Sequence, residues 1–224
     1  MVPPTGVRSA RTFANFIFDF DGTLVDSARD VLDCLRKAFE TCGISLHSYD
    51  SRIIMQFQLM ETIAALAPAI TTGERERVAE RFREIYDSID YPNTVLMPTV
   101  VELLSRLRER AAGMYIVSNK RAVPTLRILN KLNVRNFFTG VFNPDMYVTD
   151  KRMNKKELLA HALEKHSLPK ETTVYIGDSE ADVTAARGNG ISAVAVENGY
   201  GDVADFTIKP DHTVQKIIEI LTLS

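Results

Sequence analysis

The chain has 224 residues, of which 45% are hydrophobic and 25% are charged, the proportions of an ordinary soluble globular protein. A net charge of −2 gives no reason to expect nucleic acid or an anionic membrane as a partner. No apolar run approaches the roughly 18 residues that a membrane span requires, and residues 1–6 lack the features of a signal peptide. The only cysteines, Cys34 and Cys42, form no metal or redox motif, so we expect a cytoplasmic protein.

Short apolar segments alternate with amphipathic ones along most of the chain. Strands are predicted at 15–20, 113–118, 137–142, 172–177 and 191–196. Helices are predicted at 100–110, 123–132, 155–166, 181–188 and 214–223. This alternation is typical of an α/β fold with a doubly wound, Rossmann-like parallel sheet and helices on both faces.

The segment 27–95 departs from this alternation, because it shows helical patterns and no convincing strand. Val31, Leu35 and Phe39 fall at helical spacing, and Gly43 is expected to end that helix. Two further helices are predicted at 60–67 and 78–89, separated by residues 71–73. We therefore predict a Rossmann-like core made of residues 1–26 and 96–224, with a helical insertion at 27–95.

Two carboxylates, Asp19 and Asp21, follow the apolar run 15–18 of the first predicted strand, with one residue between them. Ligands bind outside the carboxyl ends of the strands in open α/β sheets, so both side chains are expected at a site. Gly22 allows a sharp turn there, and Thr23 offers a hydroxyl to a phosphate oxygen or to the loop itself, so both are expected among the substrate-binding residues.

This stretch resembles the first motif of the haloacid dehalogenase superfamily, Asp-x-Asp-x-Thr, and closely resembles its phosphoglycolate phosphatase-like branch. The resemblance implies that Asp19 attacks phosphorus to form an aspartyl-phosphate. Asp21 would protonate the leaving oxygen and later take a proton from the attacking water. It also implies that the insertion at 27–95 is a cap that closes over the site.

A second acidic motif, Gly177-Asp178-Ser179-Glu180-Ala181-Asp182, matches the superfamily's Gly-Asp-x-x-x-Asp. Aspartates that face an anionic phosphate need charge compensation, for which Mg²⁺ is the expected cation. The resemblance implies that Asp19, Asp21 and Asp178 bind the metal. Asp182 would hold a metal-bound water or orient the loop.

The two remaining motifs supply phosphate contacts. Ser118 ends a predicted strand and is expected to donate to a phosphate oxygen, helped by the backbone N–H of Asn119. The lysine motif departs from the Lys-Pro-x-Pro of similar phosphatases, because residues 151–156 contain no proline. Spacing before Asp178 favours Lys155 as the phosphate-facing lysine, with Lys151 as the alternative.

Together these motifs predict a magnesium-dependent phosphatase that hydrolyses a small phosphorylated metabolite, phosphoglycolate-like or a sugar phosphate, as a monomer or homodimer. One alternative is a sugar phosphomutase of the same fold, which is disfavoured because residues 52–58 lack the Arg-Glu-Asp-Ser segment of those caps. Another is a non-catalytic binding or regulatory protein. In similar phosphatases the segment matching 52–58 hangs over the nucleophile, so Gln56 is expected to contact the leaving group.

Overall fold

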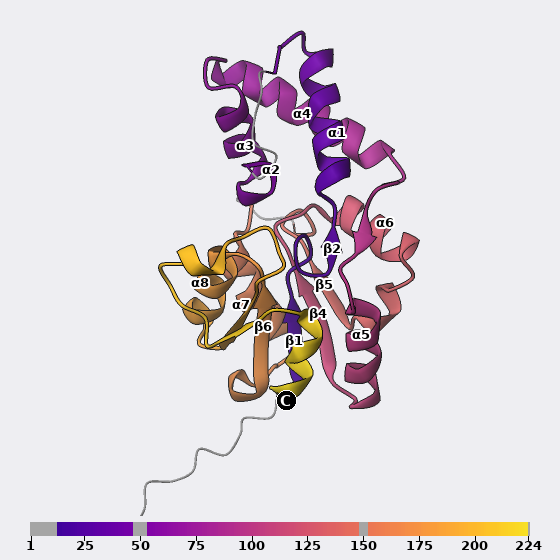
Figure 1. Ribbon diagram of the computed structural model, residues 1–224, viewed down its shortest axis with the longest axis vertical. Helices are drawn as coiled ribbons and strands as arrows, with labels where there is room; N and C mark the ends of the chain where they lie inside the picture. The colour runs from indigo at the N-terminus through magenta and orange to yellow at the C-terminus, as the bar shows by residue number, and fades with distance from the viewer. Residues whose placement is uncertain (1–12, 47–52, 148–151, 224) are drawn as a thin grey trace, which may run out of the picture.

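A six-stranded parallel sheet, in the order β5-β4-β1-β6-β7-β8, forms the centre of the molecule (Figure 1). The computed structural model describes residues 13–46, 53–147 and 152–223. The strands are β1 (Asn15–Phe18), β4 (Gly113–Val117), β5 (Gly140–Phe142), β6 (Thr173–Gly177), β7 (Ser192–Val196) and β8 (His212–Val214). The predicted Rossmann-like α/β fold is confirmed.

The central strand β1 is apolar on both sides because helices cover both faces of the sheet. Ile17 lies with α7 (Lys155–Lys165) and α8 (Glu180–Asn189) in one core cluster. Phe16 and Phe18 lie in the other cluster, with residues of α5 (Val100–Glu109) and α6 (Ala122–Lys131). Buried on both faces, β1 is held between β4 and β6 and delivers the residue after it to the carboxyl edge of the sheet.

The end of the chain differs from its predicted form. A single helix was expected at 214–223, but Val214 is the last residue of β8 and pairs with Val196. A 3₁₀ helix, η4 (Ile217–Thr222), follows it. His212 and Thr213 are exposed, so this edge strand lacks the apolar run that marks the others.

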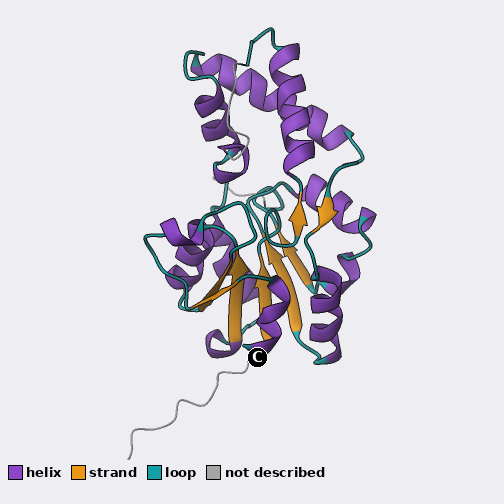
Figure 2. Ribbon diagram, viewed as in Figure 1, coloured by secondary structure: helices purple, strands orange, loops and turns teal. Residues whose placement is uncertain are grey.

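The chain between β1 and β4 builds a layer of helices over the carboxyl ends of the strands (Figure 2). These are α1 (Ala28–Thr41), α2 (Ile53–Gln56), α3 (Leu59–Leu66) and α4 (Thr72–Ser88). α1 ends before Gly43, whose φ of 70° is left-handed, as expected. Residues 72 and 73 were expected to separate two helices but lie inside α4, because Thr71 caps that helix and accepts from Glu74 N.

Two short strands mark where the chain leaves and re-enters the core. β2 (Val25–Asp26) and β3 (Val95–Leu96) pair antiparallel, and the predicted boundary at residue 95 falls within β3. Beside them, the buried Asp30 accepts hydrogen bonds from Asn93 N, Asn93 Nδ2 and Thr94 Oγ1. These contacts fix the start of α1 against the returning chain.

α5 begins at a strained residue. Thr99, its N-cap, has a φ of 67°, in the left-handed region that a β-branched side chain rarely adopts. Glycine adopts this conformation without strain, so this chain forms the turn without the residue that fits it most easily. Within the described ranges, none of the helices is long and apolar enough to cross a membrane.

Candidate active site

Asp19 is the first residue after β1, and it is buried beneath the α1–α4 layer, with 6% of its surface exposed. Its backbone N–H donates to Ile176 O at 2.8 Å, which continues the pairing of β1 with β6 by one residue. Burial raises the pKa of Asp19 above its usual range; Lys155 opposes this shift, and the carboxylates of Asp182 and Asp178 add to it. The expected nucleophile therefore lies in a buried site, close to two other carboxylates.

Lys155 neutralises part of the negative charge around Asp19. It opens α7, is 8% exposed, and places Nζ 2.8 Å from Asp19 Oδ2 and 2.6 Å from Asp182 Oδ1. Burial opposes its charge, but Asp182 and Asp19 outweigh this and hold its pKa above the usual range. Asp182 is fixed in turn, because its Oδ2 accepts from Ser179 N and Oγ. The alternative lysine, Lys151, lies outside the described residues.

Asp178, the first residue after β6, is held from both sides. Its Oδ1 accepts from Thr23 Oγ1 at 3.2 Å and its Oδ2 from Tyr200 N at 2.7 Å. Thr23 was expected to bind substrate, but this bond directs its proton to Asp178. Burial, with a smaller contribution from Asp182, raises the pKa of Asp178 above its usual range.

Glycines surround the Asp178 carboxylate because no larger residue fits. A Cβ on Gly22 would lie 2.1 Å from Asp178 Oδ2, and Gly22 has a φ of 80°. A Cβ on Gly199 would lie 2.1 Å from the Cβ of Asp178. Gly22, expected among the substrate-binding residues, therefore has a demonstrable packing role beside the acidic cluster.

The acidic cluster fits a hard divalent cation. Carboxylate oxygens of Asp19, Asp178 and Asp182 lie within 4.8 Å of one another. Asp19 Oδ1 is buried and has no hydrogen-bond partner among the described residues, a costly arrangement unless a ligand satisfies it. Oxygen-only donors suit Mg²⁺. Asp19 keeps its free Oδ1, and Asp178 accepts only from the neutral groups Thr23 Oγ1 and Tyr200 N, whereas Asp182 is paired with the cation Lys155, so Asp19 and Asp178 are the more available carboxylates.

Asp21 lies outside this cluster, although a metal contact was expected of it. Its Oδ1 accepts from Ser27 Oγ at 2.5 Å, and Lys120 Nζ lies 2.9 and 3.2 Å from its two oxygens. Lys120 also stands over the ring of Tyr86 on α4, at 4.7 Å from the centroid. The side chain of Asp21 is thus positioned by a core lysine that contacts the helical layer.

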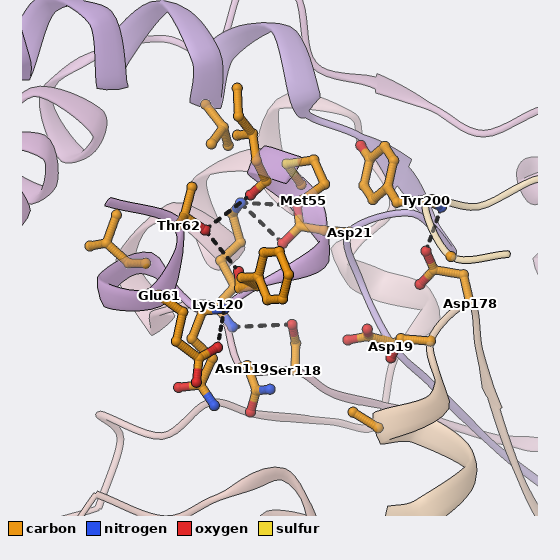
Figure 3. Close-up of a pocket in the computed structure, with 18 of the residues that line it drawn as sticks. Asp19, Asp21, Met55, Glu61, Thr62, Ser118, Asn119, Lys120, Asp178 and Tyr200 are labelled. Atoms are coloured by element: carbon orange, nitrogen blue, oxygen red, sulfur yellow. Dashed lines mark hydrogen bonds and ion pairs between the residues drawn. The ribbon is translucent and has the colours of Figure 1, made fainter. Parts of the chain in front are cut away.

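Ser118 and Asn119 follow β4 on the other side of Asp19 (Figure 3). Ser118 Oγ accepts from Lys120 N at 3.2 Å, which leaves its own proton available to an incoming oxygen. The turn formed by residues 118–120 is held in place by the buried Asn143, which donates through Nδ2 to Lys120 O at 2.8 Å. Asn119 lines the cavity described next, as a substrate contact requires.

A cavity of about 640 Å³ lies between these residues and the helical layer. Its floor holds Asp19, Asp21, Ser118, Lys155 and Asp178. Its roof comes from α1–α4 and is largely apolar, with Val31, Leu35, Ile54, Met55, Phe82 and Tyr86. Figure 3 draws Met55 and Thr62 of this layer above Ser118 and Asp19, and Glu61 near Asn119.

A family model described as haloacid dehalogenase-like hydrolase matches residues 16–196. The chain belongs to this family. It is 25% identical over 206 residues to phosphoglycolate phosphatase from Agrobacterium fabrum, covering 87% of this chain and 85% of that one. It is 31% identical over 201 residues to tyrosine-protein kinase PtkA from Mycobacterium tuberculosis, covering 88% of this chain and 66% of the kinase. A solved haloacid dehalogenase-like family hydrolase from Streptococcus pneumoniae has a TM-score of 0.82 at 26% identity, covering 94% of this chain and 97% of its own.

Two contacts of this hydrolase were missed by sequence reasoning. No sequence motif predicts a partner for Lys120, yet it pairs with Asp21. No motif predicts a role for Tyr200, yet its hydroxyl accepts from Ser27 N at 2.9 Å and donates to Asp26 Oδ1 at 2.8 Å. The glycines on either side of Tyr200 were the available signal, because they indicate a close backbone approach.

The predicted specificity segment is only partly described. Residues 53–56 form α2, and Met55 and Phe57 line the cavity of the hydrolase. Residue 52 lies outside the described residues, and so does the side chain of Gln56. The expected contact between Gln56 and the leaving group therefore stays a prediction.

Proposed function

We propose that this hydrolase is a magnesium-dependent phosphatase of a small phosphorylated metabolite, working through an aspartyl-phosphate. One observation carries the proposal: a buried aspartate with an unpaired oxygen lies beside a second carboxylate and a buried lysine. The family match supports the same conclusion, and so does the 25% identical relative named phosphoglycolate phosphatase.

The chemistry runs through Asp19 and Asp21. Asp19 attacks phosphorus, so that a bond from its oxygen to phosphorus forms while the bond to the leaving oxygen breaks. Asp21 gives a proton to that leaving oxygen, then takes one from the water that hydrolyses the aspartyl-phosphate. Contacts with Ser27 and Lys120 hold the side chain of Asp21 in position.

The other residues bind and neutralise the phosphate. Lys155 reaches Asp19 and would bind a phosphoryl oxygen there, while Ser118 and Asn119 would donate to the remaining oxygens. Mg²⁺, held by Asp19 and Asp178, would supply charge compensation for the phosphate. Thr23 and Tyr200 keep Asp178 in place.

The position of the layer α1–α4 indicates that the substrate is a small molecule. It covers the carboxyl edge of the sheet and supplies the apolar roof of the cavity. We propose that it acts as a cap, which excludes water during the reaction and admits a molecule no larger than the cavity.

The test is release of inorganic phosphate from p-nitrophenyl phosphate and a panel of phosphorylated metabolites, with magnesium and with chelator. Asp19→Asn should abolish release, because the amide cannot attack phosphorus. Asp33→Asn is the matched control, since Asp33 is a partly exposed α1 residue paired with Arg29. Mass spectrometry after an acid quench should find a phosphoryl group on the peptide that contains Asp19. Full activity of Asp19→Asn, or of chelated protein, would contradict the proposal.

The 31% identical relative named tyrosine-protein kinase favours a second candidate, transfer of a phosphoryl group from ATP to a tyrosine. Incubation with labelled ATP and a tyrosine-containing peptide separates the two. Label on the peptide, without phosphate release from any monoester, would favour the kinase. Isomerisation of a sugar phosphate without phosphate release would indicate a mutase, and no turnover in any assay would leave a binding protein.

A further inference from the structure

One wall of the cavity carries three arginines from three separate elements. Arg83 lies on α4, Arg121 is the N-cap of α6, and Arg152 precedes α7; all three line the cavity. Arg121 Nη2 donates to Arg83 O at 3.5 Å, and Arg152 Nη2 donates to Asn119 O at 2.9 Å. The last bond places this wall beside the turn that carries Ser118 and Asn119.

The charges on this wall are only partly neutralised. Arg121 forms an ion pair with Asp87. Asp87 lies one helical turn after Arg83, where it could pair with Arg83 itself. Because Asp87 pairs with Arg121 instead, it is not available to Arg83. Among the residues that the structure describes, no carboxylate forms an ion pair with Arg83. Asp145 is the carboxylate that favours the charged form of Arg152, and its Oδ1 already accepts a hydrogen bond from Ala122 N at 2.8 Å.

Four further carboxylates line the cavity but form no ion pair with these arginines among the described residues: Glu61, Glu180, Asp202 and Asp205. Three of them accept hydrogen bonds from backbone N–H groups instead, Glu61 from Gln58, Glu180 from Ile208 and Asp202 from Ala204. Lys155 is shared by Asp19 and Asp182, and Lys120 is paired with Asp21. Burial lowers the pKa of Arg152; Asp145 opposes this, while Arg83 and Arg121 add to it. Guanidinium groups on the same cavity wall repel one another, and an anionic ligand bound between them relieves this repulsion.

Resting on the proposed phosphatase activity, we propose that this wall binds a second anionic group, carried by the leaving group of the substrate. Arg83 and Arg152 would bind its oxygens, because guanidinium presents paired N–H donors that match a carboxylate or a phosphate. The chain between the two anionic groups would cross beneath the apolar side chains of Phe82 and Tyr86, which line the same cavity. The substrate class is thus a phosphomonoester with a distal carboxylate or phosphate, in contrast to a neutral sugar or alkyl phosphate.

The test compares ω-carboxyalkyl phosphates, starting with phosphoglycolate, with neutral alkyl phosphates of the same length. Alkane-α,ω-bisphosphates form a third arm, which distinguishes a distal phosphate from a carboxylate. The wild type should prefer one anionic series over the neutral one by on the order of 10-fold or more in kcat/KM. Arg83→Gln and Arg152→Gln should each reduce that preference, whereas Arg83→Lys should retain part of it.

Arg77→Gln is the matched control, because Arg77 is an exposed α4 residue next to Glu74. It should leave both series unchanged. A wild type that hydrolyses neutral and anionic esters equally, or an Arg83→Gln variant that loses both series in equal proportion, would overturn the proposal. Loss of all monoester turnover in the wild type would instead count against the phosphatase itself.

A binding measurement separates recognition from chemistry. In Asp19→Asn protein with magnesium, the preferred ω-carboxyalkyl phosphate should raise the thermal midpoint more than the neutral analogue, since a ligand stabilises the state it binds. Adding Arg83→Gln should remove the difference between the two ligands. Equal shifts before and after that substitution would overturn the proposal without reference to turnover.

Discussion

Among single residues, Lys155 balances the charge around the nucleophile. Lys155→Ala removes the cation shared by Asp19 and Asp182, so we predict a loss of turnover on the order of 10²-fold or more. The adjacent Lys156→Ala is the control, because Lys156 is exposed and should have little effect. Steady-state kinetics of both variants, with circular dichroism to confirm folding, check this prediction. A larger loss from Lys151→Ala would show that the spacing argument selected the wrong lysine.

The raised pKa values of Asp19 and Asp178 predict how stability depends on pH. Burial raises them from 3.8 to about 7 and about 6 in the protein without metal. Between about pH 4 and 7 the folded state then binds more protons than the unfolded chain, so its free energy of unfolding falls as pH rises. A cation binds the ionised carboxylates, and its stabilising effect should grow over the same range.

Thermal unfolding with magnesium and with chelator, between pH 4.5 and 8, measures that difference. Other titrating groups contribute to both curves and cancel in the comparison. Asp178→Asn is the control and should nearly abolish the magnesium increment at every pH. An increment of constant size across the range would contradict the assignment of these carboxylates to the cation site.

Between elements, Tyr200 joins the loop after β7 to the start of α1. Its backbone binds Asp178 and its hydroxyl binds Asp26 and Ser27, while Ser27 also binds Asp21. Tyr200→Phe keeps the backbone bond and loses both hydroxyl bonds, so it should loosen Asp21 more than Asp178. We predict that turnover of alkyl phosphates falls several-fold more than that of p-nitrophenyl phosphate, whose good leaving group needs little protonation.

The affinity for magnesium, measured by calorimetry, should change little in the same variant. Tyr91→Phe is a matched control, because it also removes a tyrosine hydroxyl, but one that has no hydrogen-bond partner among the described residues and does not line the cavity. Equal losses with both substrates would assign Tyr200 to general stability alone.

The sequence predicted the elements whose signals are local. The core strands were found because β1, β4, β6 and β7 are continuous apolar runs, and Asp19, Lys155 and Asp178 were found because motifs place them at element ends. β8 was missed because it is a polar edge strand recognisable only by its pairing with β7. The Lys120–Asp21 pair was missed for a similar reason, since it joins side chains 99 residues apart in the chain.

At the scale of the whole molecule, the proposed cap is an insertion whose two ends meet. Asp26 and Val95 are partners in the β2–β3 ladder, so a two-residue Asn-Gly turn could join them. We predict that a chain lacking 27–94 keeps a cooperatively unfolding sheet, with lower stability because buried apolar surface is exposed. It should also lose discrimination among substrates, since the roof of the cavity is gone.

Far-ultraviolet circular dichroism and thermal unfolding check the fold of the shortened chain, and phosphate release from the metabolite panel checks its selectivity. The matched control replaces only Pro68 and Ala69, two exposed residues of the same helical layer, with serine. A shortened chain that fails to fold, beside a control that folds, would show that the helical layer is integral to the core and that the predicted boundary is wrong.

The central place of β1 has a consequence for synthesis on the ribosome. β1 ends at Phe18, but its neighbours β4 and β6 begin only at Gly113 and Thr173. At ~5–20 residues per second, the emerging β1 waits roughly 8–30 s for its second neighbour. Throughout that time an apolar strand with both edges open is available to other chains, so the nascent protein should depend on chaperone protection until its last third is made.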